Sequence, residues 1–180
     1  TKKVVEYAHA HGVTVEGGYV TALNLNWNQL TGTIPAEIGG LTNLRVLSLY
    51  NNQLSGNIPS ELGNLTNLYR LDLRNNQLTG SIPLQINELS HLRYLYLSNN
   101  QLSSIEGELS NLTNVYSLNL EGNKLTFADL ETANINISSY SPQNFIYNNL
   151  VEDGDNIILT VPEPAGGENF QWYKNNVKVD

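Results

Sequence analysis

The sequence predicts an α/β fold: a right-handed solenoid with a curved parallel β-sheet on its concave face, short helical turns outside, and a β-rich C-terminal segment. Three observations predict it. One eleven-residue pattern occurs five times, its copies are about 24 residues apart, and its leucines alternate as they do in a strand. A fixed period of this length indicates coils that stack on one another.

The five copies define five coils over residues 20–126 and follow L-x-x-L-x-L-x-x-N-x-L. They are VTALNLNWNQL from Val20, LRVLSLYNNQL from Leu44, LYRLDLRNNQL from Leu68, LRYLYLSNNQL from Leu92 and VYSLNLEGNKL from Val115. Leucines two positions apart, such as Leu71 and Leu73, face the same side of a strand. One coil cannot bury them alone, so stacking is expected to produce a continuous leucine core.

An asparagine recurs where each strand ends and the chain turns. The column consists of Asn28, Asn52, Asn76, Asn100 and Asn123. A turn frees backbone N–H and C=O groups, and a short amide side chain has donors and an acceptor to pair with them. We interpret this asparagine ladder as structural.

The outer half of each coil has its own pattern. Pro35, Pro59 and Pro83 each follow an isoleucine and favour a short helical turn, because proline fixes φ. In the first three coils a glycine stands two residues before this isoleucine. The fourth coil lacks both that glycine and the proline, and it is one residue shorter. A local change in curvature is expected there.

The segments outside the repeat predict caps. Residues 1–19 contain KKVVEYAHAH, which favours a helix, and GVTVEGGYV, which indicates a strand and a turn. A solenoid needs ends that cover its core, so we expect this segment to be the N-terminal cap. Residues 127–180 begin with FADLETA, which we expect to close the other end, and continue into β-rich sequence.

The repeat, with its T/S-G-x-I-P continuation, resembles the plant-type leucine-rich repeat family, which occurs in plant receptor ectodomains and in bacterial surface proteins. The resemblance covers residues 20–126 and implies the solenoid fold and a binding function. Plant members carry paired cysteines in their caps, whereas this chain has no cysteine. The resemblance is therefore to the bacterial surface and secreted members.

A second resemblance lies near the C-terminus. GDNIILTV followed by FQWYKNN resembles strands B and C of immunoglobulin-like domains, with Trp172 as the buried strand-C tryptophan. It implies that Trp172 packs against Ile157, Leu159 or Val161, and that residues 127–180 hold the C-terminal cap and part of such a domain. Repeats followed by this domain resemble secreted multidomain proteins of Gram-negative bacteria.

Composition and motifs argue against several functions. A net charge of -8 and a pI near 4.8 disfavour nucleic acid as a partner. No stretch approaches the ~20 apolar residues of a membrane span. The histidines His9, His11 and His91 form no metal-ligand or catalytic pattern, and no G-x-S-x-G, P-loop or H-E-x-x-H motif occurs. We therefore expect no catalytic site, cofactor or metal: the protein is not expected to be an enzyme.

The side chains between the leucines are expected to face the concave side. They include all four arginines and five of the ten tyrosines, against only two acidic residues. Tyr, Trp and Arg are enriched in binding hot spots. The candidate ligand-binding residues are Trp27, Tyr50, Tyr69, Arg70, Asp72, Arg74, Arg93, Tyr94, Tyr96 and Tyr116. The alternative is that these residues only stabilise the sheet, since tyrosine favours strands and Arg–Asp pairs stabilise neighbouring ones.

These observations favour a non-catalytic binding module of a secreted or cell-surface bacterial protein. Its concave sheet is expected to bind a protein or an anionic glycan, for adhesion or recognition. Two alternatives stay open. The chain could be a structural spacer between other domains, or an accessory binding module of an enzyme whose catalytic domain lies outside it.

Overall fold

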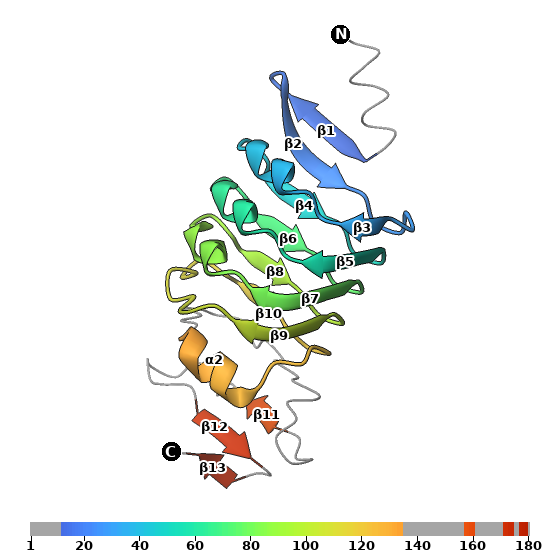
Figure 1. The fold of residues 1–180 in the computed structure, drawn as a ribbon. Coiled ribbons are helices and arrows are strands. Elements are labelled where there is room, and N and C mark those ends of the chain that lie inside the picture. The colour runs from blue at the N-terminus through green and yellow to red at the C-terminus, as the bar shows by residue number, and fades with distance from the viewer. Residues whose placement is uncertain (1–11, 135–156, 161–170, 175–176, 180) are drawn as a thin grey trace.

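The computed structural model describes residues 12–134, 157–160, 171–174 and 177–179, and it is a solenoid of stacked coils (Figure 1). A six-stranded sheet runs through the coils in the order β1-β2-β4-β6-β8-β10. Its strands are β1 (Val13–Glu16), β2 (Tyr19–Asn24), β4 (Val46–Ser48), β6 (Arg70–Asp72), β8 (Tyr94–Tyr96) and β10 (Ser117–Asn119). From β2 to β10 neighbouring strands are parallel, one from each coil. The predicted solenoid is confirmed.

The sheet begins with an antiparallel hairpin of β1 and β2. Gly17 and Gly18 form its two-residue turn with φ of 57° and 86°. Positive φ at both positions matches the right-handed twist of the flanking strands, and glycine adopts it without steric cost. The strand and turn expected in this segment are therefore present, whereas the helix expected in KKVVEYAHAH lies outside the described residues.

A second sheet of four parallel strands lies along another side of the coils (Figure 1). It consists of β3 (Thr31–Thr33), β5 (Gln53–Asn57), β7 (Gln77–Ile82) and β9 (Gln101–Ile105). The sequence did not predict it, because β3, β5 and β7 each contain a glycine of the kind that favours turns. The register of β7 against β9 shifts between Gly80 and Ser81, where the shorter fourth coil begins its outer half.

Three short 3₁₀-helices complete the first three coils: η1 (Ala36–Gly40), η2 (Ser60–Asn64) and η3 (Leu84–Glu88). Each follows the predicted proline, which has an extended backbone and φ between -69° and -73°. Successive helices lie very close together. A Cβ atom on Gly39 would collide with the carbonyl of Glu61, and one on Gly63 with the carbonyl of Gln85. These glycines permit the close stacking of the outer face.

Leucine and isoleucine side chains fill the interior as one continuous core. Leu71 and Leu95 are fully buried, as the repeat predicts. Leu23 and Leu25 of the first coil are only partly buried. A hollow of about 490 Å³ opens beside them at the N-terminal end of the core.

The helix α2 (Phe127–Ala133) follows the fifth coil and contacts β9. The Thr126 hydroxyl accepts a hydrogen bond from the Asp129 backbone N–H at 3.3 Å, and Asp129 Oδ2 accepts one from the Thr126 N–H at 2.7 Å. This reciprocal capping box satisfies two N–H groups at the start of the helix. Its end is tied to the fourth coil, because the Leu109 N–H donates to the carbonyl of Ala133 at 2.6 Å.

Beyond the coils, β11 (Ile157–Thr160), β12 (Gln171–Lys174) and β13 (Val177–Val179) form an antiparallel sheet. The β-structure predicted for this region is therefore observed in these segments. The backbone register pairs Leu159 with Trp172. Val161, another expected neighbour of Trp172, lies outside the described residues.

Candidate binding surface

Buried asparagines tie each turn to the coil before it. Asn76 Nδ2 donates to the carbonyls of Leu49 and Leu73, at 3.0 Å each, and its Oδ1 accepts from the Leu54 N–H at 3.0 Å. Leu49 and Leu54 belong to the preceding coil, so a single side chain bridges two coils. Corresponding bonds are made by Asn52, Asn100 and Asn123.

Asn28 differs from the other four asparagines of its column. It is exposed, and in the described part of the chain its side chain has no hydrogen bond. Its backbone N–H donates to Asn52 Oδ1 at 3.0 Å. The buried asparagines reach back to the previous coil, and Asn28, in the first coil, has no such coil to reach. The ladder therefore holds the backbone of Asn28 through Asn52, but the Asn28 side chain is not one of its buried members.

The candidate binding surface lies on the solvent-facing side of the six-stranded sheet. Tyr69, Tyr94 and Tyr116 form a row across β6, β8 and β10, with ring centroids 5.2 and 5.9 Å apart and edge-to-face geometry. Tyr96 lies beside Tyr94, at 6.1 Å. A hydrogen bond with Tyr69, together with the proximity of the other phenols, raises the pKa of the Tyr94 hydroxyl. The row is a continuous aromatic strip.

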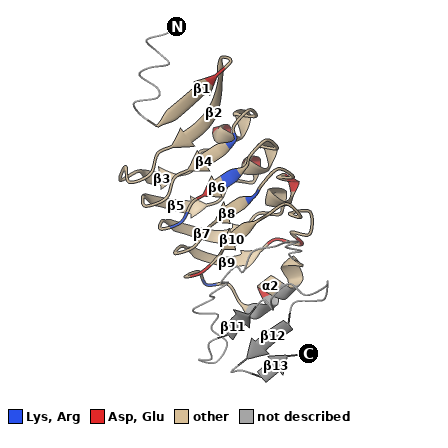
Figure 2. Cartoon of the chain, turned by 180° about the vertical axis from the view of Figure 1, so that it is seen from behind, with Lys and Arg blue, Asp and Glu red and all other residues tan. Residues whose placement is uncertain are grey.

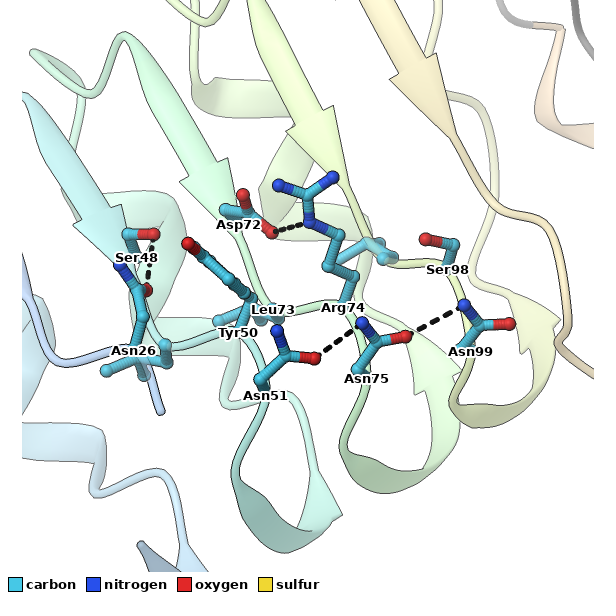
Figure 3. A network of polar contacts seen from close by, with 12 residues as sticks. Asn26, Ser48, Tyr50, Asn51, Asp72, Leu73, Arg74, Asn75, Ser98 and Asn99 are labelled. Carbon is cyan, nitrogen blue, oxygen red and sulfur yellow. Dashed lines mark hydrogen bonds and ion pairs between the residues drawn. The ribbon is translucent and has the colours of Figure 1, made fainter. Parts of the chain in front are cut away.

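Two arginines next to this row share a buried carboxylate, that of Asp72, and Figure 3 shows the contact with Arg74. Arg70 Nη2 donates to Asp72 Oδ2 at 2.8 Å, and Arg74 Nε lies 3.1 Å from Asp72 Oδ1. The second contact is an ion pair without hydrogen-bond geometry, so Oδ1 accepts no hydrogen bond among the described residues. Asp72 is fully buried. It therefore lies beneath the two arginines and positions them, whereas the sequence placed it among the ligand-facing residues.

The arginines also stack on tyrosine rings. Arg74 Cζ lies 4.9 Å from the Tyr50 ring centroid and 5.2 Å from that of Tyr96, and Arg70 Cζ lies 5.2 Å from that of Tyr96. Such cation–π contacts hold a guanidinium face while leaving N–H groups at its edge to bind a partner. We call the following set the arginine–tyrosine patch: Tyr50, Tyr69, Arg70, Arg74, Tyr94, Tyr96 and Tyr116.

Basic residues gather on the middle strands of this sheet, around β6 and β8 (Figure 2). Arg93 lies exposed beside the patch. Arg45 pairs with Glu16 at 3.6 Å, and both side chains are more than half exposed. Because Asp72 offsets one of the two patch arginines, the local positive charge is smaller than a count of arginines indicates.

An open hollow of about 580 Å³ borders the patch. Small side chains form its floor, because the second coil has Val46 and Ser48 where the third has Arg70 and Asp72. Tyr69 and Tyr94 are among its other lining residues. The side chains on this face therefore extend less far from the sheet in the first two coils than in the next two.

A second, exposed asparagine ladder follows one edge of this face (Figure 3). Asn75 Nδ2 donates to Asn51 Oδ1 at 2.6 Å, and Asn99 Nδ2 donates to Asn75 Oδ1 at 2.8 Å. All three residues have φ between 54° and 56°, a left-handed conformation that asparagine tolerates better than most residues. This ladder was not predicted, although the repeated Asn-Asn pairs signal it. In the first coil, Trp27 occupies this position, with φ of 58°.

Within the described residues, no group of three His, Cys, Asp or Glu side chains lies close enough to hold a metal ion. None of the helices described is long and apolar enough to cross a membrane.

Comparison with known proteins identifies the repeat. Models of leucine-rich repeats match residues 19–41, 42–89 and 66–125. The leucine-rich repeat ectodomain of the receptor kinase SOBIR1 from Arabidopsis thaliana is 33% identical, and the match covers 74% of this chain and 86% of that one with a TM-score of 0.61. The chain belongs to the leucine-rich repeat family. Among curated proteins, none matches it.

Two further leucine-rich repeat structures contain a ligand. The plant peptide hormone receptor RGFR1 in complex with RGF2 is 38% identical over 62% of this chain, with a TM-score of 0.57. The ectodomain of GASSHO1/SCHENGEN3 from Arabidopsis thaliana, in complex with CASPARIAN STRIP INTEGRITY FACTOR 2, is 46% identical over 54% of this chain, with a TM-score of 0.50. This leucine-rich repeat chain covers only 21% and 12% of those two proteins.

Proposed function

We propose that this chain is a non-catalytic binding module of a secreted or cell-surface protein, and that it recognises a protein segment through the arginine–tyrosine patch. The patch itself is the observation behind the proposal. Arg70 and Arg74 are fixed by Asp72 and by tyrosine rings before any partner arrives. Side chains that are already ordered lose little entropy on binding, so the contacts they make contribute more to affinity.

Similar proteins support a protein partner. Both RGFR1 and GASSHO1/SCHENGEN3 are plant receptors whose structures contain a bound factor. A leucine-rich repeat of the same kind therefore serves protein recognition outside cells in those receptors. Adhesion or recognition at a cell surface is the corresponding role proposed here.

The chemistry of the patch favours an acidic segment. Guanidinium edges pair with carboxylates, and the tyrosine row provides apolar contact beside them. The hollow over Val46 offers room for an apolar side chain next to the charged contact. An anionic glycan is the second ligand class that this chemistry fits, since the same guanidinium edges pair with sugar carboxylates or sulfates.

The test is an array of synthetic acidic, neutral and basic peptides, with a glycan array alongside. Binding should favour acidic peptides and weaken as salt rises, because exposed charges are screened over about 8–10 Å at ordinary ionic strength. The variant should be Arg70→Ala/Asp72→Asn/Arg74→Ala, because removing the arginines alone would leave the buried Asp72 unpaired. It should reduce affinity at least about tenfold, which is roughly 1.4 kcal/mol.

Arg45→Ala is the matched control, because Arg45 lies on the same face outside the patch and should leave affinity nearly unchanged. Preference for basic or neutral peptides, or unchanged binding by a folded triple variant, would contradict the proposal. A structural spacer would bind nothing on either array. An enzyme accessory module would bind and would be found linked to a catalytic domain.

We extend the proposal to the bacterial, multidomain context. The absence of cysteine supports a bacterial member of the family. The antiparallel pairing of β11, β12 and β13, with Leu159 opposite Trp172, is compatible with the start of an immunoglobulin-like domain after the C-terminal cap. Sequencing of the surrounding gene would test both, because it would show the host and whether residues 127–180 continue into a full sandwich.

A further inference from the structure

Trp27 departs from its own repeat. The same position is occupied by Asn51, Asn75 and Asn99 in the next three coils and by a glycine in the fifth. The backbone at this residue matches that of the later coils, because the Trp27 N–H donates to the Tyr50 carbonyl at 3.2 Å as the Asn51 N–H donates to that of Arg74 at 3.1 Å. The turn differs two residues later, where Gln29 has φ of 55°. Trp27 has φ of 58°. A bulky side chain is a clear outlier in that conformation.

Packing does not explain the indole. Trp27 is 72% exposed, the most exposed of the large hydrophobic side chains described. Its one aromatic neighbour in the described residues is Tyr50, at 6.4 Å between centroids in an edge-on arrangement. Strained residues held at the surface are often functional. The cost of this conformation is therefore better explained by a ligand than by the fold.

Residues with amide side chains flank Trp27 in the sequence. The sequence from Asn24 to Gln29 is NLNWNQ, and no charged residue occurs between Asn24 and Pro35. Asn28 and Gln29 are exposed, and in the described part of the chain their side chains have no hydrogen bonds. Asn26 uses its Oδ1 for the Ser48 hydroxyl, at 2.7 Å, and keeps its Nδ2 for other partners. An open aromatic face is thus bordered by several uncommitted amides.

We propose that Trp27 and these amides form a binding site for a neutral polysaccharide, beside the arginine–tyrosine patch and different from it in ligand. The C–H face of a pyranose ring packs on an indole, and its hydroxyls both donate and accept hydrogen bonds. An amide offers two donors and an acceptor, so it complements a hydroxyl, whereas it gives a charged partner no ion pair. A membrane-inserting tryptophan would be expected among apolar or basic side chains, and the sequence around Trp27 has few of either.

The probe is a panel of soluble neutral oligosaccharides: cellohexaose, xylohexaose and mannohexaose. Their affinity for the full chain is measured by calorimetry. Because the chain has only two tryptophans, the Trp172→Phe variant makes Trp27 the sole reporter of indole fluorescence. At least one oligosaccharide should cause a saturable blue shift with an affinity that does not depend on salt. By calorimetry, which needs no tryptophan signal, Trp27→Ala should abolish oligosaccharide binding, and Arg45→Ala, on the same face outside the arginine–tyrosine patch, should leave it intact.

Trp27→Asn separates a ligand-binding role from a structural one, because it restores the residue that the next three coils have. Relief of the strained conformation should raise the melting temperature by about 2–4 °C while oligosaccharide binding is lost. A lower melting temperature would show that the indole supports the fold, and the proposal would be rejected. It would also be rejected if no neutral oligosaccharide shifts the emission, or if only acidic peptides or phosphatidylcholine vesicles do. The peptide array and its triple variant test the patch separately, so the absence of an oligosaccharide site would leave the proposed function standing.

Discussion

The Nε atom of Arg74 lies 3.1 Å from Oδ1 of Asp72, and the carboxylate is fully buried while the Arg74 side chain is 35% exposed. A charge buried beneath the arginine–tyrosine patch is stabilised only while both arginines cover it. The same contact that orders the patch therefore makes its stability depend on Arg70 and Arg74.

Asp72→Ala should destabilise the fold by about 1–3 kcal/mol, because it removes a charge-assisted hydrogen bond and leaves two neighbouring arginines without their shared anion. Urea unfolding would measure the change. The exposed Arg45–Glu16 pair is the matched control, and Arg45→Ala should cost only about 0–1 kcal/mol. Equal losses in the two variants would mean that burial of Asp72 adds nothing to the ion pair.

The buried asparagine ladder can be tested within its own column. Asn76→Ala removes bonds to Leu49 and Leu73 and leaves buried backbone groups unpaired, which should cost about 1–3 kcal/mol. Asn28→Ala changes the same residue type in the exposed first coil and should stay within about 0.5 kcal/mol. Thermal or urea melts would compare the two, and a loss at Asn28 as large as that at Asn76 would contradict the assigned bonds.

Burial along the core predicts a gradient of mutational cost. Leu71→Ala creates a cavity between two coils and should cost about 2–5 kcal/mol. Leu23→Ala, in the same column of the partly open first coil, should cost clearly less because the site is already in contact with solvent. Chemical denaturation of both variants would check this. A larger loss at Leu23 would show that the N-terminal end of the core is closed in solution.

Close stacking of the 3₁₀-helices predicts opposite effects at two glycines. Gly63→Ala would push a methyl group against the Gln85 backbone and should cost about 1–3 kcal/mol. At Gly40 a Cβ would meet nothing, and Gly40→Ala should be neutral or stabilising by about 0.4–1 kcal/mol. Melting temperatures of the two variants should therefore move apart. Tolerance of alanine at Gly63 would mean that the outer face is more loosely packed than the structure shows.

The repeat made most of the solenoid predictable, and the limits of the prediction are physical. Period and alternation placed Leu71 in the core and a strand at each copy of the pattern. The second sheet was missed because Gly56 and Gly80, which favour turns, lie within its strands. Those strands form because each coil places the same segment beside its neighbour, and no single segment shows this.

For the arginine–tyrosine patch, register predicts the side of the sheet on which a side chain lies, but not how deeply it is buried. Register places Asp72 on the same side as Arg70 and Arg74, and it does so correctly. It does not show that the shorter side chain lies beneath the longer ones, because that depends on how the arginines bend towards the tyrosine rings. The exposure of Asn28 was missed for a related reason: a repeat describes inner coils, and the first coil lacks a neighbour on one side.

The asparagine bonds between coils have a consequence for evolution of the chain. The segment Asn-Asn-Gln-Leu stands at the same place in the second, third and fourth coils. Deleting residues 53–76 would join Asn52 to Gln77 and leave that segment unchanged across the junction. The gene could therefore gain or lose a whole coil by duplication or deletion, with the sheet growing or shrinking by one strand, about 4.8 Å, each time. Partners of different lengths could be matched by changing the number of coils rather than the surface of any one of them.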